Sequence, residues 1–382
     1  MDVKFKAVYT LAVQKGGCKG DDGRICRPQK LFHDANLGRS RAIVDQGWTA
    51  MGLDHADTTP TGRLARHLAA DLDAVNVMIR ARMASENAPR IPEVTAHLIE
   101  AGGKRLRPIL TLAAARLCGY DGPFHIHLAA TVEFIHTATL LHDDVVDDSA
   151  QRRGRPTANL LWDNPSSVLV GDYLFARSFQ LMVETGSLRV LDILANASAT
   201  IAEGEVLQLT AARNLATTEE TYLKVIRGKT AALFSAATQV GGVIAAAGPE
   251  IEDALFAYGD ALGIAFQIAD DLLDYGGSAA IGKNTGDDFR EGKLTLPVIR
   301  AIAAAPDEER AFWTRTIGKA GVGEGDLDTA LALMGRHGTL ASTRQTALGW
   351  AARAREALAP LPDHPLRDML SDLADHVVSR IS

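Results

Sequence analysis

Two short strings of aspartate residues combine the same side chains at the same spacing. Each occupies positions i, i+1 and i+4: Asp143, Asp144 and Asp147 in the first string, and Asp270, Asp271 and Asp274 in the second. On a helix this spacing places three carboxylates on a face roughly 100° wide. Ionised carboxylates repel one another, and burying them unpaired is costly. Mg²⁺, which prefers oxygen ligands and shares them with substrate phosphates, would relieve that repulsion. Two such faces turned toward each other would hold a diphosphate.

One such string is usually a solvated helix face or a cluster at a helix N-terminus. Both strings, however, follow about two turns of mostly apolar residues, at 134–141 and 262–269. This repetition favours buried helices, which need cations beside the carboxylates.

Fixed cations are available in two basic segments. Lys104, Arg105 and Arg107 follow a pair of glycines, which let a backbone approach a ligand closely. Arg152 and Arg153 lie just beyond the first aspartate string, where a loop can fold back over the site. The arginine fork matches phosphate oxygens bidentately. Both segments therefore suit an anion site, although basic turns are common on protein surfaces.

Further polar residues share these surroundings. His136 precedes Asp143 by two helical turns, although a lone histidine is more often a core residue, and Gln267 precedes Asp271 by one turn. We expect the segment 228–230, with Lys229 and Thr230, to open a helix and offer its N-terminal amides to an oxyanion. Two more lysines follow the second string: Lys283 and Lys293.

Two reactions need carboxylate-bound Mg²⁺ and a ring of cations in an apolar setting. Phosphoryl transfer is one, but no P-loop string is present. Heterolysis of a carbon–diphosphate bond is the other, and there apolar walls protect a carbocation from water. The Val, Leu and Ala framing of both strings favours the second reaction.

The elements that position these residues are predicted to be helices. Aromatic residues make up 5% of the 382 residues while alanine and leucine dominate, which favours helices over a β-sandwich or barrel. No strand-pair signal is found, and 151–156 is expected to be a basic loop. One all-α domain is expected, with helices over about 123–148, 165–185, 188–208, 218–228, 230–247 and 250–275.

Composition excludes several classes. A net charge of −7 without a Lys/Arg tract argues against a nucleic-acid partner. Three cysteines without metal-ligand spacing fit a reducing cytosol, so we expect a cytoplasmic protein. The longest apolar run, 231–247, is too short and too polar for a membrane span, so at most peripheral membrane contact is expected.

Residues 1–50 differ from the domain expected over 51–382. They show no helical period and carry two isolated cysteines and several Gly and Arg-Pro breaks. Such a segment buries too little apolar area to offset its ordering entropy. We expect an unstructured or non-native extension, with Met51 as an alternative start. Its aspartates argue against a targeting leader.

Taken together, the motifs resemble those of the trans-isoprenyl diphosphate synthases, in the long-chain polyprenyl (octaprenyl, solanesyl and decaprenyl) branch. The similarity covers about residues 61–382 and rests on the strings GGKRLRP, EFIHTATLLHDDVVDDSAQRRGRPTAN, GEVLQL, GKTA, FQIADDLLDY and GKNTGDDFREGKLTLPVI. Residues 1–50 have no family counterpart, and Asn284 stands where many members have proline.

The resemblance implies an all-α isoprenoid-synthase-type helical bundle around a deep apolar cavity, usually as a homodimer. It implies head-to-tail addition of isopentenyl diphosphate to an allylic diphosphate of the farnesyl or geranylgeranyl class. The product would have eight to ten units, for a quinone side chain. Both aspartate strings would bind Mg²⁺, three ions per active site, and the allylic diphosphate.

The resemblance also assigns the remaining site residues. Arg152, Lys229 and Lys283 would hold the allylic diphosphate, while Lys104, Arg107, His136 and Arg153 would hold isopentenyl diphosphate. Thr230 and Gln267, together with Lys229, would stand beside the reacting carbons. The small residues Ala138 and Thr139, with Ile135, would let the product grow into a tunnel.

Other interpretations remain open. Terpene cyclases and head-to-head synthases also use aspartate-rich helices, but they usually lack the GGKRLRP turn and paired arginines. A non-catalytic subunit of a heteromeric synthase typically loses one aspartate string, and here both are complete. The pair His142-Asp143 suggests a phosphohydrolase, yet further histidines at suitable spacing are missing.

Overall fold

The computed structural model describes residues 58–100, 103, 105–276 and 286–381. All of them belong to one compact unit, Met51–Ser382. The expected domain boundary at residue 50 lies outside the described residues.

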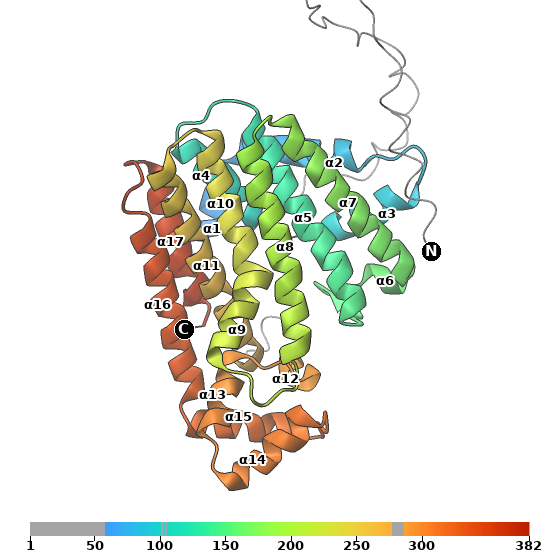
Figure 1. The fold of residues 1–382 in the computed structure, drawn as a ribbon, viewed down its shortest axis with the longest axis vertical. Helices are drawn as coiled ribbons and strands as arrows, with labels where there is room; N and C mark the ends of the chain where they lie inside the picture. Colours follow the sequence, from blue (N-terminus) through green and yellow to red (C-terminus); the bar gives the residue numbers. More distant parts are fainter. Residues whose placement is uncertain (1–57, 101–102, 104, 277–285, 382) are drawn as a thin grey trace, which may run out of the picture. The chain divides into compact units, whose positions relative to one another are not determined.

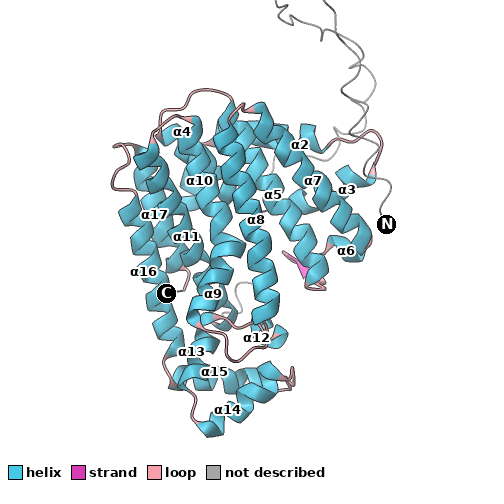
Figure 2. Cartoon of the chain, viewed as in Figure 1, coloured by secondary structure: helices cyan, strands magenta, loops and turns pink. Residues whose placement is uncertain are grey.

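The first half of this unit consists of helices and one small hairpin (Figures 1 and 2). Its elements are α1 (Pro60–His67), α2 (Ala69–Met83), α3 (Arg90–Glu100), α4 (Leu106–Leu117), α5 (Phe124–Val146), β1 (Gln151–Arg152), β2 (Arg155–Pro156), α6 (Ala158–Leu161), α7 (Asn164–Glu184) and α8 (Leu188–Ala211). The two strands pair antiparallel, with Arg152 opposite Arg155.

The second half is helical throughout its described residues. Its elements are α9 (Glu219–Ile226), η1 (Arg227–Ala231), α10 (Ala232–Ile244), α11 (Pro249–Tyr275), α12 (Asp287–Glu291), α13 (Leu296–Ala304), α14 (Asp307–Trp313), η3 (Thr314–Gly318), α15 (Asp326–Arg336), α16 (Thr339–Ala357) and α17 (Pro365–Ser379). The elements η1 and η3 are single π-helical turns.

Local sequence explains where the long helices begin. The Asp163 carboxylate accepts a hydrogen bond from the Ser166 amide at 2.6 Å and caps α7. The Ser187 hydroxyl accepts one from the Val190 amide at 3.2 Å and caps α8. Each cap satisfies an amide that the helix leaves free, an effect of about 1 kcal/mol.

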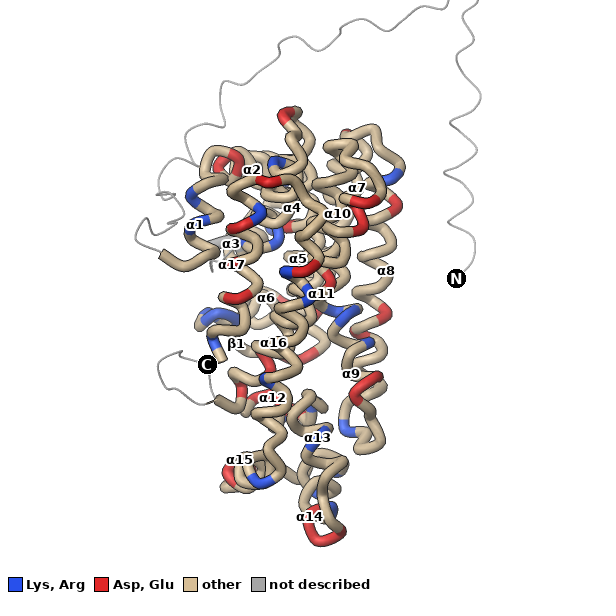
Figure 3. The backbone as a smooth tube through the Cα atoms, turned by 90° about the vertical axis from the view of Figure 1, so that its left-hand side faces the viewer, with Lys and Arg blue, Asp and Glu red and all other residues tan. Residues whose placement is uncertain are grey.

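The central helices pack around an apolar core. Helix α5 packs against α7 and α4, and α10 packs against α11, α4 and α8. Helix α10 has no charged residue and appears uniformly tan in Figure 3. The cluster that we call the apolar column joins α5, α7, α8 and α10: Leu128, Val132, Ile135, Met182, Val190, Ile193, Leu194, Ala197, Ile201, Leu233, Ala236, Ala237 and Val240.

The expected helices agree with the observed ones within three residues at each end. The expectation of no strand was wrong at 151–156, where a short hairpin forms. It escaped detection because each strand has two residues, too few for an alternating pattern. No described helix has the length and hydropathy needed to cross a bilayer.

Candidate active site

The first aspartate string lies at the C-terminal end of α5. Asp144 is fully buried, and its Oδ1 accepts a hydrogen bond from Arg152 Nε at 2.8 Å. Its Oδ2 has no hydrogen-bond partner in the described part of the chain. The hairpin therefore does fold back over the string, as expected, and leaves one buried carboxylate oxygen available to a ligand.

Asp143 is flanked by residues of α8 and η1. Burial, with the nearby Glu205 carboxylate, raises the pKa of Asp143 to about 7, while Lys229 and Arg152 oppose the rise. Lys229 Nζ lies 2.8 Å from Glu205 Oε2. Because the local cations do not offset burial fully, Asp143 would gain from a further cation.

The second string lies at the C-terminal end of α11. Asp271 is buried; its Oδ2 accepts a hydrogen bond from the Tyr222 hydroxyl at 2.6 Å and its Oδ1 one from Gln267 Nε2 at 2.8 Å. Gln267 Oε1 in turn accepts from Thr230 Oγ1 at 2.7 Å. A chain of neutral donors thus runs from η1 to the carboxylate.

Asp274 is held by the backbone at the start of α12. Its two carboxylate oxygens accept hydrogen bonds from the amides of Asp287, at 3.2 Å, and Asp288, at 3.1 Å. Burial is the main cause that raises the pKa of Asp274, and these amides oppose it. Asp270, on the same helix turn, is partly exposed.

Lys293 lies between the two strings. Its Nζ is 3.7 Å from Asp147 Oδ2 and 2.6 Å from Glu291 Oε2. Burial, with Asp271 and Asp274, raises the pKa of Asp288, and Lys293 opposes that rise. Lys293 thus contacts Asp147 of the first string and lines one cleft together with Asp271 of the second.

A cleft opens beside Lys293. It is partly open to solvent, and Lys229, Gln267, Asp271, Asp288 and Lys293 contribute to its polar lining. The lining carries both lysine and aspartate side chains, which suits an anion bound together with cations.

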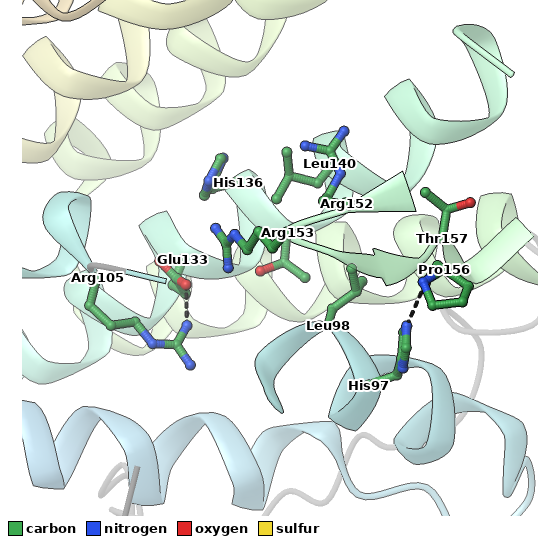
Figure 4. Close-up of a pocket in the computed structure, with 11 residues that line it drawn as sticks. His97, Leu98, Arg105, Glu133, His136, Leu140, Arg152, Arg153, Pro156 and Thr157 are labelled. Atoms are coloured by element: carbon green, nitrogen blue, oxygen red, sulfur yellow. Dashed lines mark hydrogen bonds and ion pairs between the residues drawn. The ribbon is translucent and has the colours of Figure 1, made fainter. Parts of the chain in front are cut away.

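A second, small pocket adjoins the first string (Figure 4). Figure 4 shows His136 from α5 and Arg152 and Arg153 from the hairpin turned toward one another, with Arg105 paired to Glu133 at one side. Arg152 also bonds to Asp144 and therefore links this pocket to the first string.

His136 is kept neutral in this pocket. Burial, followed by the charges of Arg107, Arg153 and Arg152, lowers the pKa of His136 well below its usual value. Arg107 Nη1 lies 3.2 Å from His136 Nε2, so the guanidinium donates to the ring nitrogen. Burial lowers the pKa of Arg107 to about 10, which leaves it charged at neutral pH. The pocket is therefore strongly cationic.

The glycine turn and the hairpin fit closely together. A Cβ at Gly103 would stand 2.7 Å from Arg153 Nη1, so a larger residue there would displace the Arg153 guanidinium. Arg105, Asp148 and Arg153 all have positive φ, between 48° and 54°. Residues with such φ values cluster at functional sites, and two of the three, Arg105 and Arg153, line the second pocket.

Small or apolar residues of α5 precede the first string. Ala138 and Ile135 are fully buried, and Thr139 is partly buried. Ile135 belongs to the apolar column.

Two candidates cannot be placed, and one expectation was wrong. Lys104 and Lys283 lie outside the described residues. The segment at Lys229 and Thr230 does not open a helix; it forms the π-turn η1 between α9 and α10. The turn arises where Gly228 packs against Gly204 of α8, since a Cβ on Gly228 would lie 2.9 Å from the Gly204 Cα.

Several residues near the site were not expected from the sequence. Tyr222 precedes Lys229 by seven residues and Glu133 precedes His136 by three, spacings that place each pair on one helix face. Glu205 and Asp288 fall inside strings already noted for their resemblance, but they received no role. Helical spacing was thus the signal that could have revealed the first two.

The site fits a hard divalent cation. No three Asp, Glu, His or Cys side chains of the described residues gather as a ready coordination cluster. The available donors are nevertheless all carboxylate oxygens, including the buried, unpartnered Oδ2 of Asp144. Such sites bind Mg²⁺ through a few carboxylates and complete its coordination with substrate phosphates and water.

Comparisons with known proteins agree with this chemistry. The sequence model of the Polyprenyl synthetase family matches residues 88–334. Octaprenyl diphosphate synthase of Escherichia coli K12 is 46% identical over 313 residues, covering 82% of this chain and 96% of that protein.

Two solved structures are also similar. A decaprenyl diphosphate synthase from Rhodobacter capsulatus shares 75% identity with a TM-score of 0.83, covering 85% of this chain and 100% of that one. A polyprenyl synthase from Caulobacter crescentus, complexed with calcium and isoprenyl diphosphate, shares 51% identity with a TM-score of 0.80, covering 84% and 98%. The chain belongs to the polyprenyl synthetase family.

Proposed function

We propose that this protein is a Mg²⁺-dependent trans-polyprenyl diphosphate synthase. It adds isopentenyl diphosphate units head-to-tail to an allylic diphosphate and yields an all-trans product of eight to ten units. The observation that carries the proposal is the position of Lys293, which contacts Asp147 of the first string and lines a cleft together with Asp271 of the second. A cationic pocket for a second diphosphate adjoins the first string.

The cleft receives the allylic diphosphate. The six carboxylates of the two strings would hold Mg²⁺, three ions in this proposal, and the metal would supply positive charge to the leaving diphosphate. Arg152 and Lys229 add fixed positive charge, and Lys283 is assigned the same role from the family resemblance. Asp144, held by Arg152, and Asp271, held by Tyr222 and Gln267, keep fixed orientations.

The cationic pocket receives isopentenyl diphosphate. Arg107 and Arg153 supply charge, and neutral His136 supplies a ring N–H without adding repulsion between the arginines. Lys104 is assigned to this group from the family resemblance. Because no carboxylate of the aspartate strings lines this pocket, it distinguishes isopentenyl diphosphate from the allylic substrate.

Arg152 lines the cationic pocket and bonds to Asp144 of the first string, so in this proposal the reacting carbons lie between the pocket and the aspartate strings. The allylic carbon–oxygen bond breaks, and diphosphate leaves with the electron pair. The double bond of isopentenyl diphosphate then forms the new carbon–carbon bond, and the released diphosphate accepts the proton lost from the product. Thr230 and Gln267 present oxygen atoms beside this region and stabilise developing positive charge.

The finer assignments follow from the relatives and from the small or apolar residues of α5. The Rhodobacter capsulatus relative, 75% identical, is a decaprenyl synthase, so ten units is the favoured product. We further propose that the starter is a farnesyl or geranylgeranyl diphosphate, that the product supplies a quinone side chain, and that the enzyme works in the cytoplasm with at most peripheral membrane contact.

A homodimer is also proposed. Large apolar side chains are exposed along α7 and at the start of α8, including Leu169, Val183 and Leu188, which are 66%, 65% and 82% exposed. An apolar face of this kind is typical of a protein interface. Leu169→Glu should convert a dimer to a monomer in sedimentation equilibrium, while an unchanged mass would contradict this interface.

One incubation tests the activity. The protein is mixed with Mg²⁺, farnesyl diphosphate and labelled isopentenyl diphosphate, and butanol-extractable label is measured. Label in long products, absent without Mg²⁺, supports the proposal. Product from farnesyl diphosphate alone would indicate a cyclase, and product that appears only with a second subunit would indicate a non-catalytic partner.

A further inference from the structure

Tyr222 of α9 contacts the second aspartate string and lines the cleft beside Lys293. Its hydroxyl donates to Asp271 Oδ2 at 2.6 Å. Tyr222 is 4% exposed and Asp271 5% exposed. A bond this short between two buried groups fixes the carboxylate firmly, because water is not present in bulk to compete for it.

The donors to Asp271 are both neutral. Tyr222 holds Oδ2 and Gln267 holds Oδ1. An ionised carboxylate offers about four lone-pair positions, so each oxygen retains one for a further ligand. Asp144 differs, because the Arg152 guanidinium cancels its charge. Asp271 is therefore oriented without being neutralised.

The helical segment that carries Tyr222 also supports the second donor to Asp271, Gln267. Thr230, in the π-turn that continues α9, donates to Gln267 Oε1 at 2.7 Å. Tyr222 acts on the carboxylate directly and Thr230 acts through the amide. The plane of the Asp271 carboxylate is thus fixed from both of its oxygens by one segment, 222–230.

We propose that Tyr222 is a positioning residue for divalent-cation binding at the second aspartate string. Its hydroxyl holds the Asp271 carboxylate so that a free lone pair points to the cation that accompanies the diphosphate. The inference rests on the proposed function. Loss of a hydrogen bond to a metal-ligating side chain typically lowers metal affinity about 10- to 100-fold, and we expect an effect of that size.

The test compares Tyr222→Phe with a matched control. Tyr222→Phe removes only the hydroxyl. Tyr275→Phe removes the hydroxyl of another buried tyrosine, at the end of α11, whose oxygen lies 3.0 Å from Thr295 Oγ1. Both variants lose one buried hydrogen bond, but only the first loses a bond to an aspartate of the strings.

Two readouts separate positioning from stability. The first is the initial rate against Mg²⁺ concentration at saturating substrates. For Tyr222→Phe, half-maximal rate should need at least about tenfold more Mg²⁺, with most of the maximal rate recovered at high Mg²⁺. The second uses no turnover: the melting temperature is followed during a Mg²⁺ titration with inorganic pyrophosphate, and the same displacement to higher Mg²⁺ is expected.

The proposal is overturned if the Mg²⁺ dependence of Tyr222→Phe stays within twofold of wild type, or if Tyr275→Phe is displaced equally. Should Tyr222→Phe fail to fold, Tyr222→Met is measured in its place; failure of both would make Tyr222 a structural residue and also overturn the proposal. Wild-type turnover in the same assay tests the function separately. The pyrophosphate titration can be read even if that turnover is absent.

Discussion

Product length should respond to the size of side chains along α5, because the growing chain is expected to pass down this helix from the aspartates. Ala138 lies five residues before Asp143, about 7.5 Å along the helix axis. One isoprene unit advances through four carbon–carbon bonds of about 1.5 Å each, roughly 5 Å of zigzag chain. Ala138→Phe should therefore stop growth after about three units, counting the one that carries the diphosphate.

A second bulky substitution, nearer the start of α5, gives an internal comparison of product lengths. Val132 lies six residues nearer the start of α5, about 9 Å further from the aspartates, and is fully buried in the apolar column. Val132→Phe should give products about two units longer than Ala138→Phe. Each overpacked core site costs about 1–3 kcal/mol of stability, so both variants should fold but melt earlier.

The assay is reversed-phase chromatography of dephosphorylated products, started from geranyl diphosphate so that the starter fits above either bulky side chain. The rate of the first condensation should stay near wild type. Ala347→Phe, at a fully buried alanine of α16, supplies the same overpacking away from α5 and should leave product length unchanged. A wild-type distribution for Ala138→Phe, or shorter products from Val132→Phe than from Ala138→Phe, would refute this path.

Three further changes test other parts of the account. Asp143→Ala or Asp270→Ala should lower turnover at least about 10²-fold with unchanged helicity by circular dichroism; near-normal Mg²⁺-dependent turnover would contradict the role of both strings. Asp71→Asn should lower the melting temperature at pH 7, and by progressively less as pH falls below about 4. The hydrogen bond from Arg116 lowers the pKa of Asp71 in the folded state. The stabilisation is therefore present above the unfolded pKa of about 3.9 and is lost as pH falls through the folded pKa. A difference in melting temperature between wild type and variant that does not change with pH would contradict this. A chain beginning at Met51 should melt at the wild-type temperature and make the same product at the same rate, and a loss of several degrees or of most activity would show that residues 1–50 contribute.

The helices and the strings were predictable because their signals are local. Pro and Gly residues mark the helix ends, and the repeated aspartate spacing needs no knowledge of other segments. The apolar residues before Asp143 and Asp270 correctly indicated helices α5 and α11, with their aspartates at the C-terminal ends.

The remaining features depend on contacts between distant segments. The π-turn at Lys229 accompanies the close contact of Gly228 with Gly204, which helical periodicity does not report. Arg105 was expected as one of three cations for a ligand, but it pairs with Glu133, 28 residues away. Tyr222 reaches Asp271 across 49 residues. Sequence patterns reveal which side chains share a face, but not which faces meet.

The central claim is that both aspartate strings hold one diphosphate through divalent cations. A crystal structure with Mn²⁺ and an unreactive allylic thiodiphosphate tests it directly, because anomalous scattering locates each ion. The account predicts Mn²⁺ on the α5 string and on the α11 string, all bridged by the same diphosphate in the cleft beside Lys293. Ions on one string alone, or a diphosphate bound away from this cleft, would contradict it.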